Sequence, residues 1–224
     1  MTEEARGLPF GEMAAAPPET LGLLMLKNDP HAARLDDRTQ LAAVSDALAD
    51  GAAAASDLRK RFLRLAPREI AHALRVPVEA TDDDPLVGSI WRFAEYRPRP
   101  PRIVLYTRGL APLEQALAGN LATRMLGEAT AQDVFVAHEL YHHIEATRTD
   151  TPVARRHQAM LFQIGKWRWR TGIAMLGEIA AGSFAQALLD LPCHPKALDY
   201  LARPPHRGSF NSNPLRSGRL REGS

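Results

Sequence analysis

Two histidines and a glutamate lie close together in the segment VFVAHELYHHIEA, residues 134–146. His138 and His142 are four residues apart, and Glu139 directly follows the first of them. On an α-helix, residues four apart share a face with about 5–6 Å between their Cβ atoms, so both imidazoles can reach one ion. Glu139 would lie beside that ion, where it can take a proton from a metal-bound water. The spacing therefore predicts a zinc site that performs hydrolysis.

The alternative is a solvent-facing helix that matches the pattern by chance. The composition gives about 0.02 expected matches to His-Glu-x-x-His in a chain of this length, so coincidence is a weak explanation. The residues around the motif also predict a helix that is buried over much of its circumference. Buried histidines and carboxylates need partners, because an unpaired buried charge costs several kcal/mol. The apolar flanking residues are Val134, Phe135, Val136, Ala137, Leu140, Tyr141 and Ile144.

A catalytic zinc usually has three protein ligands and keeps its fourth position for water, so a third ligand is needed. Glu178 is the best candidate, because it is the only charged residue from residue 171 to residue 189. A lone carboxylate on so apolar a helix needs a compensating cation, either a divalent metal or a basic group such as Arg168 or Arg170. Small residues on the same face would let this helix approach the His138 helix closely: Ala174, Ala181, Gly182 and Ala185.

Two other polar residues near the motif fit the metal less well. Glu145 shares a face with His142 but lies about 10 Å along the helix axis from His138, so we expect it to pair with Arg148 or to face solvent. His143 is rotated by about 100° from His142 on the same helix. The metal ligands predicted from the sequence are therefore His138, His142 and Glu178, with Glu139 as the catalytic base.

The elements that must position these residues follow from periodicity and capping signals. The motif helix is expected to begin at Thr130, which has capping-box spacing to Asp133, and to end at 147–149. Alternating apolar residues and flanking prolines predict two strands, SIWRFAEY and RIVLYT. Further helices are expected at 18–65 with a break at Gly51, from residue 67 onward, at 112–126, at 155–169 and at 172–189.

Composition and charge narrow the class of protein. Of the 224 residues, 45% are hydrophobic and 24% are charged, which is ordinary for a globular chain. Cys193 is the only cysteine, so an internal disulfide and a multi-cysteine zinc cage are both excluded. The formal net charge is +2, while the segment 203–224 holds five arginines and one glutamate. Because we find no secretory signal and no clear membrane span, we expect a cytoplasmic protein with no membrane partner.

Two segments suggest nucleic-acid or membrane contacts. KWRWRTG, residues 166–172, alternates cations and indoles. On the helix predicted there, Trp167 and Trp169 would lie about 200° apart and form no common face, so we interpret them as residues around a helix end. The segment LAPREIAHALRVPVEATDD resembles the first half of a helix-turn-helix, but it continues into an acidic stretch that phosphates would repel. We therefore do not expect nucleic-acid binding.

The chain resembles the ImmA/IrrE-type metallopeptidases, a branch of the gluzincins, from Pro67 to Pro192. REIAHALRVPV is similar to the family's helix and entry strand, and GSIWRFAEYRPRPPRIVLYTRGL is similar to its paired strands. FVAHELYHHIE matches the zinc helix, and AAGSFAQALLDLP resembles the family's Phe-Ala-x-x-Leu-Leu-x-Pro ending. The family's glutamate usually stands four residues before the phenylalanine, where this chain has Ala180. Glu178 lies two residues earlier.

The resemblance implies that His138 and His142 are zinc ligands and that Glu139 is the catalytic base. It also implies cleavage of a peptide or a regulatory protein. RIVLYT would then form the edge of the cleft, where an extended peptide could bind by strand addition. Tyr106 and His157 are the two candidates for an additional oxyanion donor.

We predict an α+β fold: a zincin-like metallopeptidase domain, mostly helical with a small sheet, preceded by a helical N-terminal extension. The expected division is a helical extension at 1–65, the metallopeptidase domain at 66–202 and a basic, disordered tail at 203–224. The predicted function is zinc-dependent peptide-bond hydrolysis. Two alternatives remain: a regulatory or interaction protein that binds metal with little peptidase activity, and a DNA-associated regulator.

Overall fold

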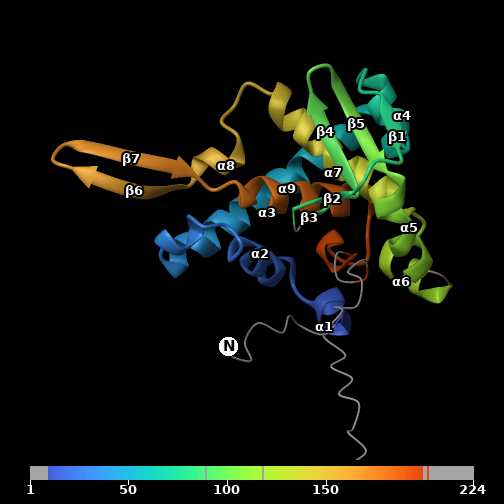
Figure 1. Cartoon of the computed structure of the whole chain (residues 1–224), viewed down its shortest axis with the longest axis horizontal. Coiled ribbons are helices and arrows are strands. Elements are labelled where there is room, and N and C mark those ends of the chain that lie inside the picture. Colours follow the sequence, from blue (N-terminus) through green and yellow to red (C-terminus); the bar gives the residue numbers. More distant parts are fainter. Residues whose placement is uncertain (1–9, 89, 118, 199–200, 202–224) are drawn as a thin grey trace, which may run out of the picture.

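Three helices from distant parts of the sequence form the centre of the molecule. They are α3 (Asp37–Arg61), α7 (Ala131–Thr147) and α9 (Met175–Leu189). In the computed structural model, which describes residues 10–88, 90–117, 119–198 and 201, α9 packs against both α3 and α7 (Figure 1). The α9 sequence is apolar on nearly every side, which is typical of a helix that is covered by neighbours. This arrangement places Glu178, in the first turn of α9, beside the motif helix.

The long helix α3 is continuous through Gly51, so the break predicted there is wrong. The glycine instead allows α3 and α9 to approach each other. A Cβ atom at this position would lie 2.1 Å from the carbonyl oxygen of Ala180 and 2.8 Å from the amide nitrogen of Phe184. No side chain fits in that space. The glycine is therefore explained by helix packing rather than by a helix end.

Substituting Gly51 by alanine is expected to destabilise the protein by about 1–3 kcal/mol, because the added methyl group must push α9 away. At an exposed helical position the same change would stabilise by about 1 kcal/mol. Chemical denaturation of the two proteins measures the difference. Ala53→Gly, at an exposed position of the same helix, is the control and should cost about 1 kcal/mol. A Gly51→Ala variant as stable as the wild type would contradict the close contact.

A three-stranded sheet covers one side of α7. Its strand order is β1 (Val78–Thr81), β5 (Pro101–Tyr106) and β4 (Ala94–Pro98), with β1 parallel and β4 antiparallel to β5. The RIVLYT segment therefore lies in the central strand, and its predicted position at the edge is wrong. The edge strand on the side of α7 is β4. Strand order depends on pairing between distant segments, which the local pattern of RIVLYT does not contain.

The remaining elements are short. The predicted helix at 112–126 is two helices, α5 (Thr107–Ala116) and α6 (Asn120–Leu126), separated near Gly119, whose φ of +70° suits glycine. The acidic segment after α4 (Pro67–Ala73) contains β1, so α4 is not followed by the second helix of a helix-turn-helix. The short elements are α1 (Phe10–Ala15), α2 (Pro18–Leu26), η2 (Ala32–Arg34), α4 (Pro67–Ala73), β2 (Leu86–Val87), β3 (Ile90–Trp91), α5 (Thr107–Ala116), α6 (Asn120–Leu126), α8 (Val153–Arg156) and η3 (Pro195–Ala197).

The helix predicted at 155–169 is wrong, because this segment forms a β-hairpin. Strand β6 (Gln158–Ile164) pairs with β7 (Trp167–Gly172) in antiparallel register, and the hairpin extends away from the helices (Figure 1). Gly165 has a φ of +58° in the two-residue connection, a position where glycine favours a tight hairpin turn. The alternation of apolar and polar residues on both sides of Gly165 is a strand pattern, and it outweighs the helical propensity of the neighbouring segments.

The chain is α+β, as predicted. The boundary expected at residue 65 falls in the turn between α3 and α4. Residues of α2 and α3 nevertheless belong to the same hydrophobic core as α7 and α9. The helices at 18–61 are therefore packed into the molecule, and the domain division stays a prediction. The tail predicted at 203–224 lies outside the described residues.

Candidate metal centre

The motif helix α7 begins as the sequence predicts. Thr130 is its N-cap: the Thr130 hydroxyl accepts from the Asp133 amide at 3.1 Å, and the Asp133 carboxylate accepts from the Thr130 amide at 3.0 Å. This reciprocal pair fixes the first turn. The helix then buries apolar residues against α9 and the sheet, so the phase of the helix sets which way His138 and His142 face.

His138, His142 and Glu178 converge on one point between α7 and α9. The Nε2 atoms of the two histidines are 3.3 Å apart. The Glu178 Oε2 atom lies 3.2 Å from Nε2 of His138, and its Oε1 atom lies 3.6 Å from Nε2 of His142. Two atoms bound to zinc at about 2.1 Å in a tetrahedron are about 3.4 Å apart, so the three groups have the spacing of a zinc ligand set. The structure thus brings together the three residues that the sequence selected.

The protonation states of these groups also suit a cation. Partial burial raises the pKa of Glu178, but the hydrogen bond and charge of His138, together with His142, outweigh it and lower the pKa to about 2. Burial, followed by the charge of His138, lowers the pKa of His142 to about 4. At neutral pH the cluster therefore presents an ionised carboxylate and a neutral His142 imidazole, the forms that bind metal.

Glu139 is buried beside the ligands and is held by the sheet. Its Oε2 atom accepts a hydrogen bond from the backbone amide of Tyr96, in β4, at 2.7 Å. Burial raises the pKa of Glu139 to about 7, although the charge of His138 acts in the opposite direction. A carboxylate that titrates near neutral pH can both accept and return a proton under physiological conditions. Because Oε2 is occupied by Tyr96, Oε1 is the atom available for that transfer.

A cavity of about 440 Å³ adjoins the cluster. It lies between α7, the first turns of α9, the β3–β4 segment and residues 194–196. Its wall combines His138, Glu139 and Glu178 with apolar and aromatic side chains, a composition typical of ligand sites. The other lining residues are Met25, Ile90, Trp91, Arg92, Phe93, Ala94, Val134, Phe135, Met175, Gly182, His194, Pro195 and Lys196.

His194 lies in this wall, and sequence reasoning did not assign it to the site. The His194 Nδ1 atom accepts a hydrogen bond from the backbone amide of Lys196 at 3.1 Å, so the ring proton is on Nε2. The Nε2 atom is buried without a hydrogen-bond partner among the described residues. The ring fits there because Gly182 has no side chain: a Cβ on Gly182 would lie 2.6 Å from Cε1 of His194. The sequence around residue 194 contains no local motif that predicts this contact.

The motif's other polar neighbours have separate partners. The Glu145 carboxylate accepts the amide of Val153 at 3.2 Å and lies 3.9 Å from the guanidinium of Arg148, the partner predicted for it. The Nδ1 atom of His143 lies 3.0 Å from the hydroxyl of Tyr96. Both residues therefore take part in contacts between elements, outside the three-residue cluster.

The two predicted oxyanion donors lie elsewhere. The Tyr106 side chain is fully buried, and its hydroxyl donates to Glu95 at 2.7 Å. The Nε2 atom of His157 lies 3.2 Å from the Asp46 carboxylate on α3. Neither lines the cavity beside the metal cluster. Tyr106 and His157 thus lack the position that an oxyanion donor needs, and both predictions are wrong.

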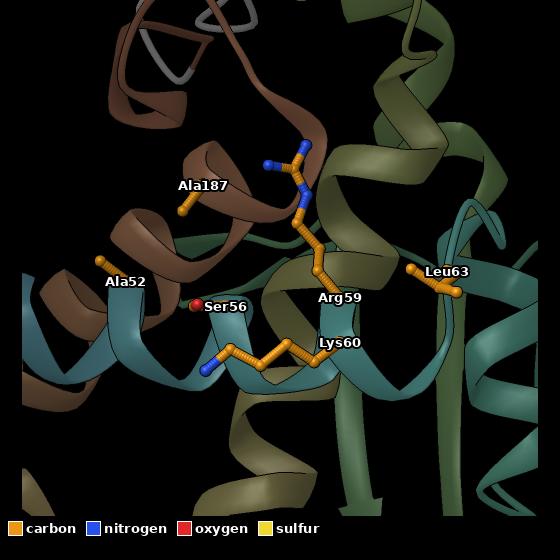
Figure 2. Close-up of a pocket in the computed structure, with 6 residues that line it drawn as sticks. All are labelled: Ala52, Ser56, Arg59, Lys60, Leu63 and Ala187. Carbon is orange, nitrogen blue, oxygen red and sulfur yellow. The ribbon is translucent and has the colours of Figure 1, made fainter.

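A second hollow, between α3 and α9, has a different character. Figure 2 shows Ala52, Ser56 and Arg59 of α3 facing Ala187 of α9, with Leu63 in the turn just after α3. The volume is about 350 Å³, and the residues that line it include no histidine and no carboxylate. It offers no metal ligands, and among the described residues the group whose ligand atoms could hold a metal ion is His138, His142 and Glu178.

Comparison with known proteins found no match: no protein-family model, no curated protein and no solved structure is similar to the chain at a significant level. The resemblance to the ImmA/IrrE-type metallopeptidases therefore depends on the sequence motifs. A search of the described helices for membrane spans found none that is both long enough and apolar enough.

Proposed function

We propose that this protein is a zinc-dependent metallopeptidase with a zincin-like fold, in which His138, His142 and Glu178 hold the metal. The observation that carries the proposal is the convergence of three ligand groups, with polar atoms 3.2–3.6 Å apart, from residues separated by up to 40 positions. The ligand types and spacing fit zinc, and the neighbouring carboxylate of Glu139 has the position of a general base.

Different residues of the chain have different roles in the hydrolysis. A bound zinc ion would polarise the scissile carbonyl and acidify the attacking water. The Oε1 atom of Glu139 accepts a proton from the attacking water, and Glu139 then delivers this proton to the leaving amine. The Tyr96 amide holds Oε2, which keeps the carboxylate oriented while the proton moves. The apolar cavity wall restricts water around the reacting groups.

The substrate of this reaction is an extended peptide, either free or as part of a protein. The Tyr96 amide donates to Glu139, so the side of β4 that faces away from β5 looks toward the metal cluster. A peptide added to this edge by backbone hydrogen bonds would pass the Glu139 carboxylate. This assigns the role of substrate strand to β4, in place of the RIVLYT strand expected from the sequence.

Metal analysis tests the proposal. We expect the purified protein to bind about one zinc per chain, and His138→Ala and His142→Ala each to lose it, because two remaining ligands hold zinc weakly. Glu178→Gln is expected to lower the affinity at least about tenfold, since a neutral amide is a poorer zinc ligand. The measurement is zinc content after dialysis, followed by competition with a chelator.

His143→Ala is the matched control, because His143 lies on the same helix and contacts Tyr96 outside the cluster. It should retain zinc at the wild-type level. Full zinc retention in both the His138→Ala and His142→Ala variants would overturn the metal site. Equal zinc affinity in wild type and Glu178→Gln, combined with loss in Glu145→Gln, would assign the third ligand to Glu145.

A further inference from the structure

One face of the β6–β7 hairpin is apolar over the half nearest its tip. Phe162 pairs with Trp169, and Ile164 pairs with Trp167, so these four side chains lie on the same side of the two strands. The Phe162 and Trp169 rings stack with centroids 5.8 Å apart. Their exposed fractions are 50% for Phe162, 70% for Ile164, 83% for Trp167 and 62% for Trp169. Four neighbouring exposed apolar side chains on a projecting arm are typical of an interaction site.

The opposite face is mainly polar and basic, with Met160 as an apolar member near the base. Gln163 pairs with Arg168, and Met160 pairs with Arg170, while Lys166 stands in the turn at the tip. The sequence contains no aspartate or glutamate from residue 151 to residue 177. The hairpin is therefore amphipathic and positively charged, and its charge is complementary to an anionic partner.

The base of the hairpin is fixed to the body of the molecule. Arg34, from η2, donates to the carbonyl oxygens of Met160 and Leu161 at 3.3 Å and 3.1 Å, where the strand register shifts. At the other strand, a Cβ on Gly172 would lie 2.4 Å from the carbonyl oxygen of Ala154, so α8 packs tightly on it. The arm thus presents its tip at a defined place, away from the helices α7 and α9 (Figure 1).

We propose that the β6–β7 hairpin docks on the surface of an anionic lipid bilayer, with Phe162, Ile164, Trp167 and Trp169 entering the interface and Lys166 and Arg168 contacting lipid phosphates. Tryptophan rings favour the boundary between headgroups and acyl chains. Arginine and lysine side chains can bury their stems there while their charged ends reach the phosphates. The sequence-based argument against a membrane contact assumed a helix at 155–169, which the hairpin replaces.

A second copy of the chain fits this surface less well. Stacking two apolar faces would bury roughly 600 Å² on each partner, below the about 800 Å² of a standard interface. It would also bring two equally charged arms together. Single-stranded nucleic acid needs cations beside the stacking rings, whereas Arg168 and Arg170 lie on the face opposite to Trp167 and Trp169.

Vesicle binding by the full chain tests the proposal. The probes are vesicles of phosphatidylcholine alone and with about one third phosphatidylserine, whose anionic surface attracts basic residues. We expect the wild type to sediment with the anionic vesicles and its tryptophan emission to shift to shorter wavelength. Ile164→Ser combined with Trp167→Ser, and Lys166→Glu combined with Arg168→Glu, should each lower the partition coefficient at least about tenfold.

The controls change equally exposed residues elsewhere. Leu63→Ser removes an apolar side chain that is 76% exposed, and Arg59→Glu with Lys60→Glu reverses two cations on α3; both should bind as the wild type does. Failure of the wild type to bind, binding without dependence on phosphatidylserine, or undiminished binding by the hairpin variants would each overturn the proposal. The proposal would also be overturned if the wild type did not bind vesicles but instead formed a dimer, or bound an oligothymidine probe, and the hairpin variants lost that interaction.

Discussion

Replacing Glu139 by glutamine is expected to lower kcat for peptide cleavage at least about a hundredfold, and up to about ten-thousandfold, while zinc remains bound. Glutamine keeps a carbonyl oxygen that can accept the Tyr96 amide, so the side chain is expected to stay in place. It cannot take a proton from water, and the general base is lost. The two readouts are the turnover of a cleaved protein substrate and the zinc content of the same preparation.

Glu145→Gln is the matched control, because Glu145 is a carboxylate on the same helix that contacts Val153 and Arg148. It should keep both zinc and activity. Equal turnover by Glu139→Gln and the wild type would remove Glu139 from the mechanism. A wild type that binds zinc and leaves every offered protein and peptide intact would favour the alternative of a metal-binding interaction protein.

The candidate metal cluster could be predicted from the sequence because each of its members carries a local signal. His138 and His142 have helical spacing, and the capping pair at Thr130 fixes where their helix begins. Glu178 stands out because burying a lone carboxylate on an apolar helix is costly without a cation. These signals concern single helices, whose periodicity is set by backbone geometry alone. That α9 would lie beside α7 followed only from the need to neutralise Glu178.

Features that depend on contacts between distant segments could not be predicted in the same way. The position of β5 in the middle of its sheet follows from pairing with both β1 and β4. His194 enters the cavity wall because Gly182 leaves room for its ring. The hairpin at Gly165 did have a local signal, the alternation of Trp167 and Trp169 with arginines, and interpreting that alternation as helical gave the wrong geometry.

Asp50 connects α3 to the motif helix and carries the second large expected effect. Its carboxylate accepts from the Tyr141 hydroxyl at 2.6 Å, from Arg148 at 2.8 Å and from Arg156 at 2.5 Å. Asp50→Asn is expected to destabilise the protein by about 3 kcal/mol or more at pH 7, because it leaves the partly buried Arg148 without its main counter-charge. Tyr141 directly precedes His142, so the variant should also loosen the metal cluster.

The pH dependence of stability provides an independent check on Asp50. Burial raises the pKa of Asp50, but the hydrogen bonds from Tyr141, Arg148 and Arg156 outweigh it and hold the pKa below its ordinary value. A folded-state pKa below the unfolded value of about 3.9 adds stability that is fully present above that value and is lost as the pH falls through the folded pKa. The gap in unfolding free energy between wild type and Asp50→Asn should therefore be widest at neutral pH and should shrink as the pH falls below about 4.

Urea denaturation at pH 7 and at acidic pH measures that gap, with Asp57→Asn as the control on the same helix. Asp57 forms an exposed pair with Lys60 at 2.9 Å, so its loss should cost no more than about 1 kcal/mol at either pH. If Asp50→Asn were as mild as Asp57→Asn, the cluster of Tyr141, Arg148 and Arg156 would not stabilise the fold. A large loss of unfolding free energy that is the same at both pH values would mean that packing, rather than the charge of Asp50, holds the arginines in place. Only a large cost that declines in acid connects the charge of Asp50 to the placement of α7 against α3, and so to the position of the two histidines that the motif supplies.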